Sequence, residues 1–520
     1  MKNVHRSLVI GCSALALASC GGDEIVSPGT SGDIVINNPA PAPTPAPTPA
    51  PTSSLVTPAA GCPTINSTGG LRDAGTITGP TGTYRVCELP ALVDADDTLP
   101  YIAGLLYSLP GRVDIGTDRG FASTGSNVEL TIQPGVTVFG GTGRSFLVAN
   151  RGNQLIANGT ATRPIVFTSR DNVLGLTNDS SIGQWGGVVL LGRAPVADCR
   201  VGGVNTAAAP NTNASCEQEL EGANTTTLFG GSNSADSSGS LRYVQIRYSG
   251  FSLAPGRELQ SLTTGGTGTG TTIDHFQSFN SSDDGMEFFG GSVNMKYVVA
   301  VGADDDSIDV DSGARANMQY VVAVQRSEGG DNIIELDSPN EAATNSAAIP
   351  QTILNVANFT FIQRASTATQ SIRARGGAKL NLVNGVISAD GDPCLRIDDP
   401  ETFAADPDSF SVVGACSASR PNRGNTNPSD QQVQDDFIAD SSNNNSAFTL
   451  SLTGVIVNGA NENAVTATNP TTISSFFDAT TYVGAVRNAQ DTWYRDWTCN
   501  SSILDLGSAN GICTRIPVYS

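Results

Sequence analysis

The chain has 520 residues and a formal net charge of −21, with 49 aspartates and glutamates against 28 lysines and arginines. An acidic surface of this kind repels nucleic acid and attracts metal cations, so nucleic acid is excluded as a partner. His5 and His275 are the only histidines, which excludes a histidine-rich zinc site.

Residues 1–19 are predicted to be a lipoprotein signal peptide. Basic Lys2 and Arg6 precede an apolar run from Leu8 to Ala18, a pattern typical of a secretory signal. The sequence Leu17-Ala18-Ser19-Cys20 resembles the bacterial lipobox. The resemblance implies cleavage before Cys20, a lipid on that cysteine, and attachment to the outer membrane, with the cell-surface side favoured.

Residues 20–60 are predicted to hold the lipid anchor and a linker. The Pro-Ala-Thr repeat from Pro39 to Thr52 favours the extended polyproline II conformation. This segment is therefore a spacer that separates a folded domain from the membrane.

Eight cysteines besides Cys12 and Cys20 fall in pairs that are close in sequence, and the chain has no Cys-x-x-Cys motif. An even number in an exported chain favours disulfides over metal ligation, although sequence alone leaves other connectivities open. The expected pairs are Cys62–Cys87, Cys199–Cys216, Cys394–Cys416 and Cys499–Cys513.

From about Asn127 onward, short segments of Val, Ile, Leu and Phe alternate with Gly, Asn, Asp and Ser. No segment keeps a helical period, and 57 glycines favour one long all-β solenoid. We predict an N-terminal cap over residues 61–126, a single-stranded parallel β-helix over 127–475 and a C-terminal cap over 476–520.

Five segments of the predicted solenoid alternate inward apolar or small residues with outward charged or large ones. The outward positions recur after steps of 22, 26, 38 and 23 residues, and 22 to 26 residues suit one coil. The longer step holds a loop-like insert from Ser338 to about Thr352. Stacked at about 4.8 Å, the segments would form a stripe about 20 Å long. Its two columns are Glu287, Asp309, Glu335, Arg373, Arg396 and, two residues on, Phe289, Asp311, Asp337, Arg375, Asp398.

Residues 134 to about 399 resemble the right-handed parallel β-helix proteins with pectate-lyase-type repeats. More narrowly, the sequence Ser-Ser-Asp-Asp-Gly-Met-Glu-Phe-Phe-Gly-Gly from Ser281 to Gly291 is similar to a motif shared by bacterial surface β-helix proteins. The resemblance implies the fold, a right-handed parallel β-helix with capped ends. It implies no common activity.

Stacked carboxylates on adjacent strands repel each other unless a cation compensates them. Calcium takes six to eight oxygen ligands in irregular geometry, so we expect it here. In the alternative interpretation, the aspartates shape turns and the strand carboxylates are solvated or paired with Arg373 and Arg375. The predicted metal ligands are Asp284, Glu287, Asp306, Asp309 and Glu335.

The leading hypothesis is a surface lipoprotein whose β-helix face binds calcium and a glycan or protein partner, rather than an enzyme. Ligand contacts are expected from Phe289, Asp311, Asp337 and Asp398. By resemblance to pectate lyases, a second hypothesis is a calcium-dependent polysaccharide lyase with Arg373, Arg375 or Arg396 as the base. A third is a structural envelope component without a small ligand.

Overall fold

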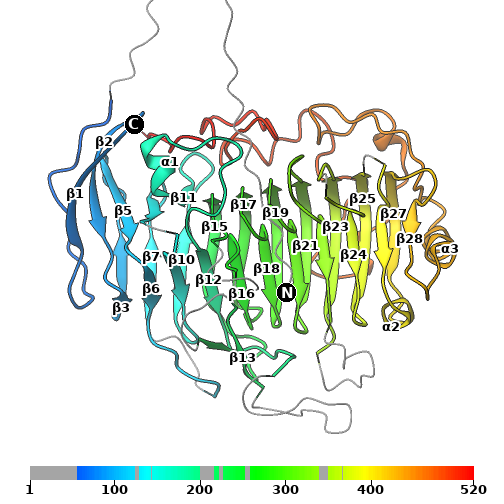
Figure 1. Ribbon diagram of the computed structural model, residues 1–520, viewed down its shortest axis with the longest axis horizontal. Helices are drawn as coiled ribbons and strands as arrows, with labels where there is room; N and C mark the ends of the chain where they lie inside the picture. The colour runs from blue at the N-terminus through cyan, green and yellow to red at the C-terminus, as the bar shows by residue number, and fades with distance from the viewer. Residues whose placement is uncertain are drawn as a thin grey trace, which may run out of the picture. The chain divides into compact units, whose positions relative to one another are not determined.

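Parallel strands stack coil upon coil in the computed structural model of the protein (Figure 1). The structure describes residues 55–122, 128–141, 143–199, 216–221, 227–251, 258–338, 350–365, 367–389 and 391–519. The predicted signal peptide, Cys20 and the Pro-Ala-Thr repeat lie outside these residues. Among the described residues, no helix has the length and apolar character needed to cross a membrane.

The fold is a right-handed parallel β-helix, as predicted, and two sheets carry it. The large sheet has fifteen strands. They are β1 (Arg72–Gly79), β2 (Gly82–Glu88), β4 (Asp97–Leu99), β5 (Leu105–Leu109), β7 (Glu129–Ile132), β8 (Thr137–Gly140), β10 (Gln154–Asn158), β11 (Ile165–Ser169), β15 (Gly239–Arg247), β17 (Thr272–Phe279), β19 (Ser292–Val301), β21 (Arg315–Val324), β23 (Ile353–Ile362), β25 (Lys379–Ser388) and β27 (Asp408–Ala415).

The small sheet has eleven strands, all paired in parallel, and it carries the predicted stripe. They are β3 (Leu92–Val93), β6 (Arg112–Ile115), β9 (Phe146–Ala149), β12 (Gly187–Leu191), β16 (Leu262–Gly265), β18 (Met286–Phe289), β20 (Ile308–Asp311), β22 (Ile334–Leu336), β24 (Ile372–Ala374), β26 (Leu395–Ile397) and β28 (Asn422–Arg423). Outside both sheets lie the hairpin β13 (Gln218–Glu219) and β14 (Leu228–Phe229), and the helices α1 (Arg170–Leu174), α2 (Pro400–Ala404) and α3 (Asp430–Asp440).

The core consists of apolar side chains that repeat at the same position of successive coils. In the small sheet, one inward residue per strand aligns in register and is fully buried. Burial of such a column removes a long apolar surface from water and fixes the register, because a one-residue slip would turn every charge inward. The column is Phe288, Val310, Leu336, Ala374 and Ile397.

The long strands of the large sheet bend at one left-handed residue per coil. Seven such residues have φ between 50° and 60° and occupy one register position. Asparagine tolerates this conformation, whereas bulky residues are strained in it. Ring stacking accompanies the bulky members, since His275 lies 4.2 Å from Tyr243 and 4.3 Å from Tyr297 between ring centroids. The column is Tyr243, His275, Tyr297, Tyr320, Asn358, Asn384 and Ser411.

The C-terminal segment runs back along the large sheet, and we call residues 445–519 the C-terminal strap (Figure 1). Glutamine side chains bind its backbone: Cys499 N–H donates to Gln277 Oε1 at 2.8 Å, and Gln277 Nε2 donates to Cys499 O at 3.2 Å. At its end, the Tyr101 hydroxyl donates to the carbonyl of Tyr519 at 3.0 Å. The strap therefore spans many coils, unlike the cap predicted for residues 476–520.

Both ends of the solenoid differ from the predicted boundaries. At the C-terminal end, α3 inserts Val433 and Phe437 into the main core cluster, so this helix covers the last coil. At the N-terminal end, parallel pairing already joins β2 to β5, within the predicted cap of residues 61–126. The four predicted disulfides are all formed: Cys62–Cys87, Cys199–Cys216, Cys394–Cys416 and Cys499–Cys513.

Candidate functional site

The outward column of the small sheet has the predicted register. Glu287 pairs with Asp309, Asp309 with Glu335, Glu335 with Arg373, and Arg373 with Arg396 on strands β18 to β26. The loop insert between Glu335 and Arg373 leaves this register intact because β22 and β24 still pair directly.

The structure adds Arg423 of β28, which pairs with Arg396 and extends the column by one coil. Sequence reasoning missed it. Its separation of 27 residues from Arg396 fits one coil, but the two-residue strand has no alternation to reveal it.

Seven carboxylates at the β18–β22 end of the stripe form three overlapping groups, and we call them the acidic ladder. Within each group, one oxygen from each of three residues lies within 4.8 Å of the other two. No ion pair with lysine or arginine involves these seven residues in the described part of the chain. The groups are Asp283, Asp284 and Asp305; Asp284, Glu287 and Asp309; and Asp305, Asp306 and Asp331.

Two members of the acidic ladder shape the turns before the strands. Asp284 Oδ1 accepts a hydrogen bond from the backbone N–H of Asp306 at 2.9 Å, and Asp306 Oδ1 accepts one from that of Asn332 at 2.5 Å. Each aspartate thus ties its turn to the next coil. This agrees with the turn-shaping role in the alternative interpretation.

Glu287 and Asp309 have no such role. The Glu287 residue is 6% exposed, yet its carboxylate accepts no hydrogen bond from any described residue. Asp309 Oδ1 is buried and likewise lacks a hydrogen-bond partner within the described residues. A buried carboxylate without a donor is costly, so these two side chains are arranged for a proton or a cation.

Burial and mutual repulsion raise the pKa values of the carboxyl groups. For Glu287 and Asp309, desolvation comes first and neighbouring carboxylates add to it, chiefly Asp309 for the former and Asp311 for the latter. The same causes raise the pKa of Asp283 to about 7 and that of Asp311 to about 7. Near neutral pH, these carboxyl groups therefore retain protons that ordinary aspartates have lost.

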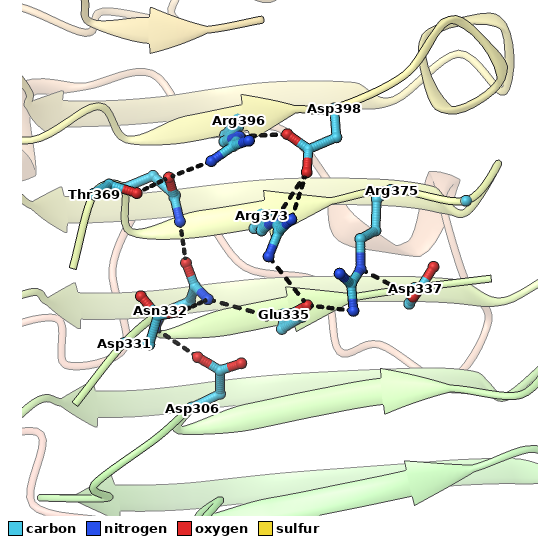
Figure 2. A network of polar contacts seen from close by, with 12 residues as sticks. Asp306, Asp331, Asn332, Glu335, Asp337, Thr369, Arg373, Arg375, Arg396 and Asp398 are labelled. Atoms are coloured by element: carbon cyan, nitrogen blue, oxygen red, sulfur yellow. Dashed lines mark hydrogen bonds and ion pairs between the residues drawn. The ribbon is translucent and has the colours of Figure 1, made fainter. Parts of the chain in front are cut away.

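Charges at the other end of the stripe neutralise one another in a network of ion pairs (Figure 2). Arg375 binds Glu335 at 2.7 Å and Asp337 at 2.9 Å, while Arg373 binds Asp398 at 2.8 Å and Glu335 at 3.5 Å. Arg396 also pairs with Asp398. We call these six residues the arginine network.

The arginine network changes the expected role of Glu335. The sequence predicts it as a metal ligand, but its carboxylate pairs with two arginines and accepts a hydrogen bond from Asn332 at 3.2 Å. Pairing with Arg373 and Arg375, foreseen in the alternative interpretation, thus applies here and not at the acidic ladder. Asp337 and Asp398, predicted as ligand contacts, are engaged in the same network.

The network also bears on the arginines proposed as a base. Burial alone would lower the pKa of Arg375, but Glu335 and Asp337 outweigh it and raise the pKa. A guanidinium stabilised in its charged form is poorly suited to accept a proton. Arg373 and Arg396 are held by the ion pairs of the same network.

Phe289, predicted as a ligand contact, is covered by other apolar side chains. It is 7% exposed, and its ring centroid lies 6.1 Å from that of Phe229 in β14. Phe289, Phe229 and Cys216 belong to one apolar cluster that covers this part of the small sheet. Asp311, two residues after Asp309, stays beside the acidic ladder and pairs in register with Phe289.

Comparison with known proteins gives one match. A family model described as "Pectate-lyase like beta helix domain" matches residues 119–498, which is more than half of the chain. No curated protein and no solved structure matches.

Proposed function

The chain belongs to the family of pectate-lyase-like β-helix domains, and we propose that its acidic ladder binds calcium and, through calcium, an anionic polysaccharide. The observation that carries the proposal is the group of Asp284, Glu287 and Asp309. Three carboxylate oxygens converge within 4.8 Å, and two of the side chains have no other partner among the described residues.

Oxygen ligands from carboxylates are those that calcium prefers. Three carboxylates supply at most six of the six to eight oxygens that the ion takes, so water or a ligand would complete the shell. A carboxylate of an acidic polysaccharide is a suitable additional ligand. Asp311, on the same strand as Asp309, would lie beside the bound polysaccharide.

Calcium binding is tested by titration calorimetry on the full mature chain and on Glu287→Gln and Asp309→Asn. We expect the parent to bind calcium and each variant to bind at least about tenfold more weakly, a change of about 1.4 kcal/mol. Asp435→Asn, at an exposed position of α3, is the matched control and should bind as the parent does. Equal affinity in the parent and both ladder variants would refute the proposal.

Polysaccharide binding is tested on a uronic acid polymer with and without calcium. The proposal requires retention that depends on calcium and is lost in Asp309→Asn. The same incubation addresses the lyase alternative, because a lyase produces unsaturated uronate ends that absorb ultraviolet light. Since Arg375 is held in its charged form by two carboxylates, we expect no rise in absorbance.

We also propose that the protein acts at the outer membrane, anchored by a lipid on Cys20 and favouring the cell surface. The lipobox-like sequence before Cys20 supports this. In cells given a labelled fatty acid, the parent should incorporate the label and Cys20→Ala should not, with Cys12→Ala as the control. Label in Cys20→Ala would contradict the anchor.

A further inference from the structure

Positive charges are stacked at the basic end of the stripe, as negative charges are in the acidic ladder. Arg373, Arg396 and Arg423 occupy one register position on β24, β26 and β28. Like charges directly opposite each other on neighbouring strands are destabilising unless an opposite charge compensates them. Asp398 compensates the first two, since it pairs with both Arg373 and Arg396.

Arg423 lacks this compensation. It makes no ion pair and no hydrogen bond through its side chain with any described residue, and its Nε is buried without a partner. The two carboxylates that act electrostatically on Arg423 are engaged with other arginines. Asp398 pairs with Arg373 and Arg396, and Asp430 binds Arg420 at 2.6 and 3.0 Å. Desolvation is the first cause that lowers the pKa of Arg423, and repulsion by Arg396 and Arg420 adds to it.

The side chain remains accessible, as Arg423 is only partly buried. A guanidinium has five N–H donors in a planar fork that matches an oxyanion, whether a carboxylate or a sulfate. We propose that Arg423 is the centre of an oxyanion-binding subsite that receives an acidic group of the bound polysaccharide. The inference rests on the proposed function for its polymeric ligand, but not for the anion site itself.

The acidic ladder and the Arg423 subsite would bind one polysaccharide molecule together. Asp309 on β20 and Arg423 on β28 are separated by four strand steps, or about 19 Å at about 4.8 Å per step. A polyanion along the small sheet would meet calcium at one end of the stripe and the Arg423 guanidinium at the other. The neutral arginine network lies between them.

The test compares Arg423→Gln with Arg315→Gln, an exposed arginine on the large sheet, in the full mature chain. Binding of inorganic sulfate and of polygalacturonate in saturating calcium is measured by calorimetry. We expect Arg423→Gln to weaken both about tenfold, as for one lost charge-assisted hydrogen bond, and Arg315→Gln to change neither. Melting curves check that both variants are folded.

The outcomes separate this inference from the proposed function. Calcium affinity should be the same in Arg423→Gln as in the parent, because the acidic ladder is untouched. If the parent binds sulfate through Arg423 but no polygalacturonate, the oxyanion site stands and the carboxylate polysaccharide is overturned as its ligand. If Arg423→Gln binds both probes as the parent does, the inference is wrong, whatever calcium does.

Discussion

Calcium-free protein should lose stability as the pH rises from about 4 to about 8, the reverse of ordinary acid denaturation. The folded-state pKa of Asp311 is about 7 against 3.8 for the free group. A raised pKa contributes stability that is complete below the unfolded value and is lost as the pH rises through the folded value. Three pKa units correspond to about 4 kcal/mol at most, and Asp283 acts in the same direction.

Urea unfolding of chelator-treated protein at pH 5 and pH 8 measures this difference. Asp311→Asn should reduce the pH dependence, whereas Asp435→Asn should not. Saturating calcium should stabilise the protein at pH 8 by about 2.7 kcal/mol at a hundredfold excess over its dissociation constant. A chelated protein that is more stable at pH 8 than at pH 5 would contradict the raised pKa values.

Asp236→Asn should destabilise the fold by about 3 to 5 kcal/mol, because it removes the carboxylate from a buried ion pair. Asp236 Oδ1 accepts hydrogen bonds from Arg193 Nε at 3.1 Å and from Arg193 Nη2 at 2.7 Å, and Asp236 Oδ2 accepts one from the Arg193 backbone N–H at 2.8 Å. Both side chains are 2% exposed. The pair fixes the segment that leads to Val196, which packs with Phe289.

The matched control is Asp430→Asn, which removes an exposed pair with Arg420. Exposed pairs contribute about 1 kcal/mol or less, so the free energy of unfolding should change little. If urea unfolding gives equally small losses for both variants, the buried pair does not hold this part of the fold.

The sequence predicts the stripe because its signal is local and periodic. Alternation within Met286–Phe289 or Ile308–Asp311 sets which side chains face outward, and the coil length sets which strand each pairs with. The same reasoning does not reveal which charged side chains are available to a ligand and which form ion pairs with one another. Glu335 lies at the boundary, and its pairing with Arg373 and Arg375 depends on side-chain conformations.

Long-range packing is equally hidden from sequence periodicity. The burial of Phe289 depends on Phe229, sixty residues earlier in the chain and outside the small sheet. The C-terminal strap binds Gln277 and Gln319 through its backbone. Any residue type can supply a backbone N–H, so these contacts produce no recognisable sequence pattern in the strap. For these reasons the sequence predicts Phe289 as a ligand contact and residues 476–520 as a cap, where the structure has a covered ring and a strap.

A crystal of the protein grown with calcium, with anomalous diffraction recorded at a long wavelength, shows directly whether the acidic ladder binds the ion. We expect an anomalous peak among the carboxylates of Asp284, Glu287 and Asp309, with calcium–oxygen distances of about 2.3 to 2.6 Å. The contrary result is no peak in calcium-soaked crystals and Glu287 hydrogen-bonded directly to Asp309. The acidic ladder would then be a set of carboxyl groups that share protons, without a metal.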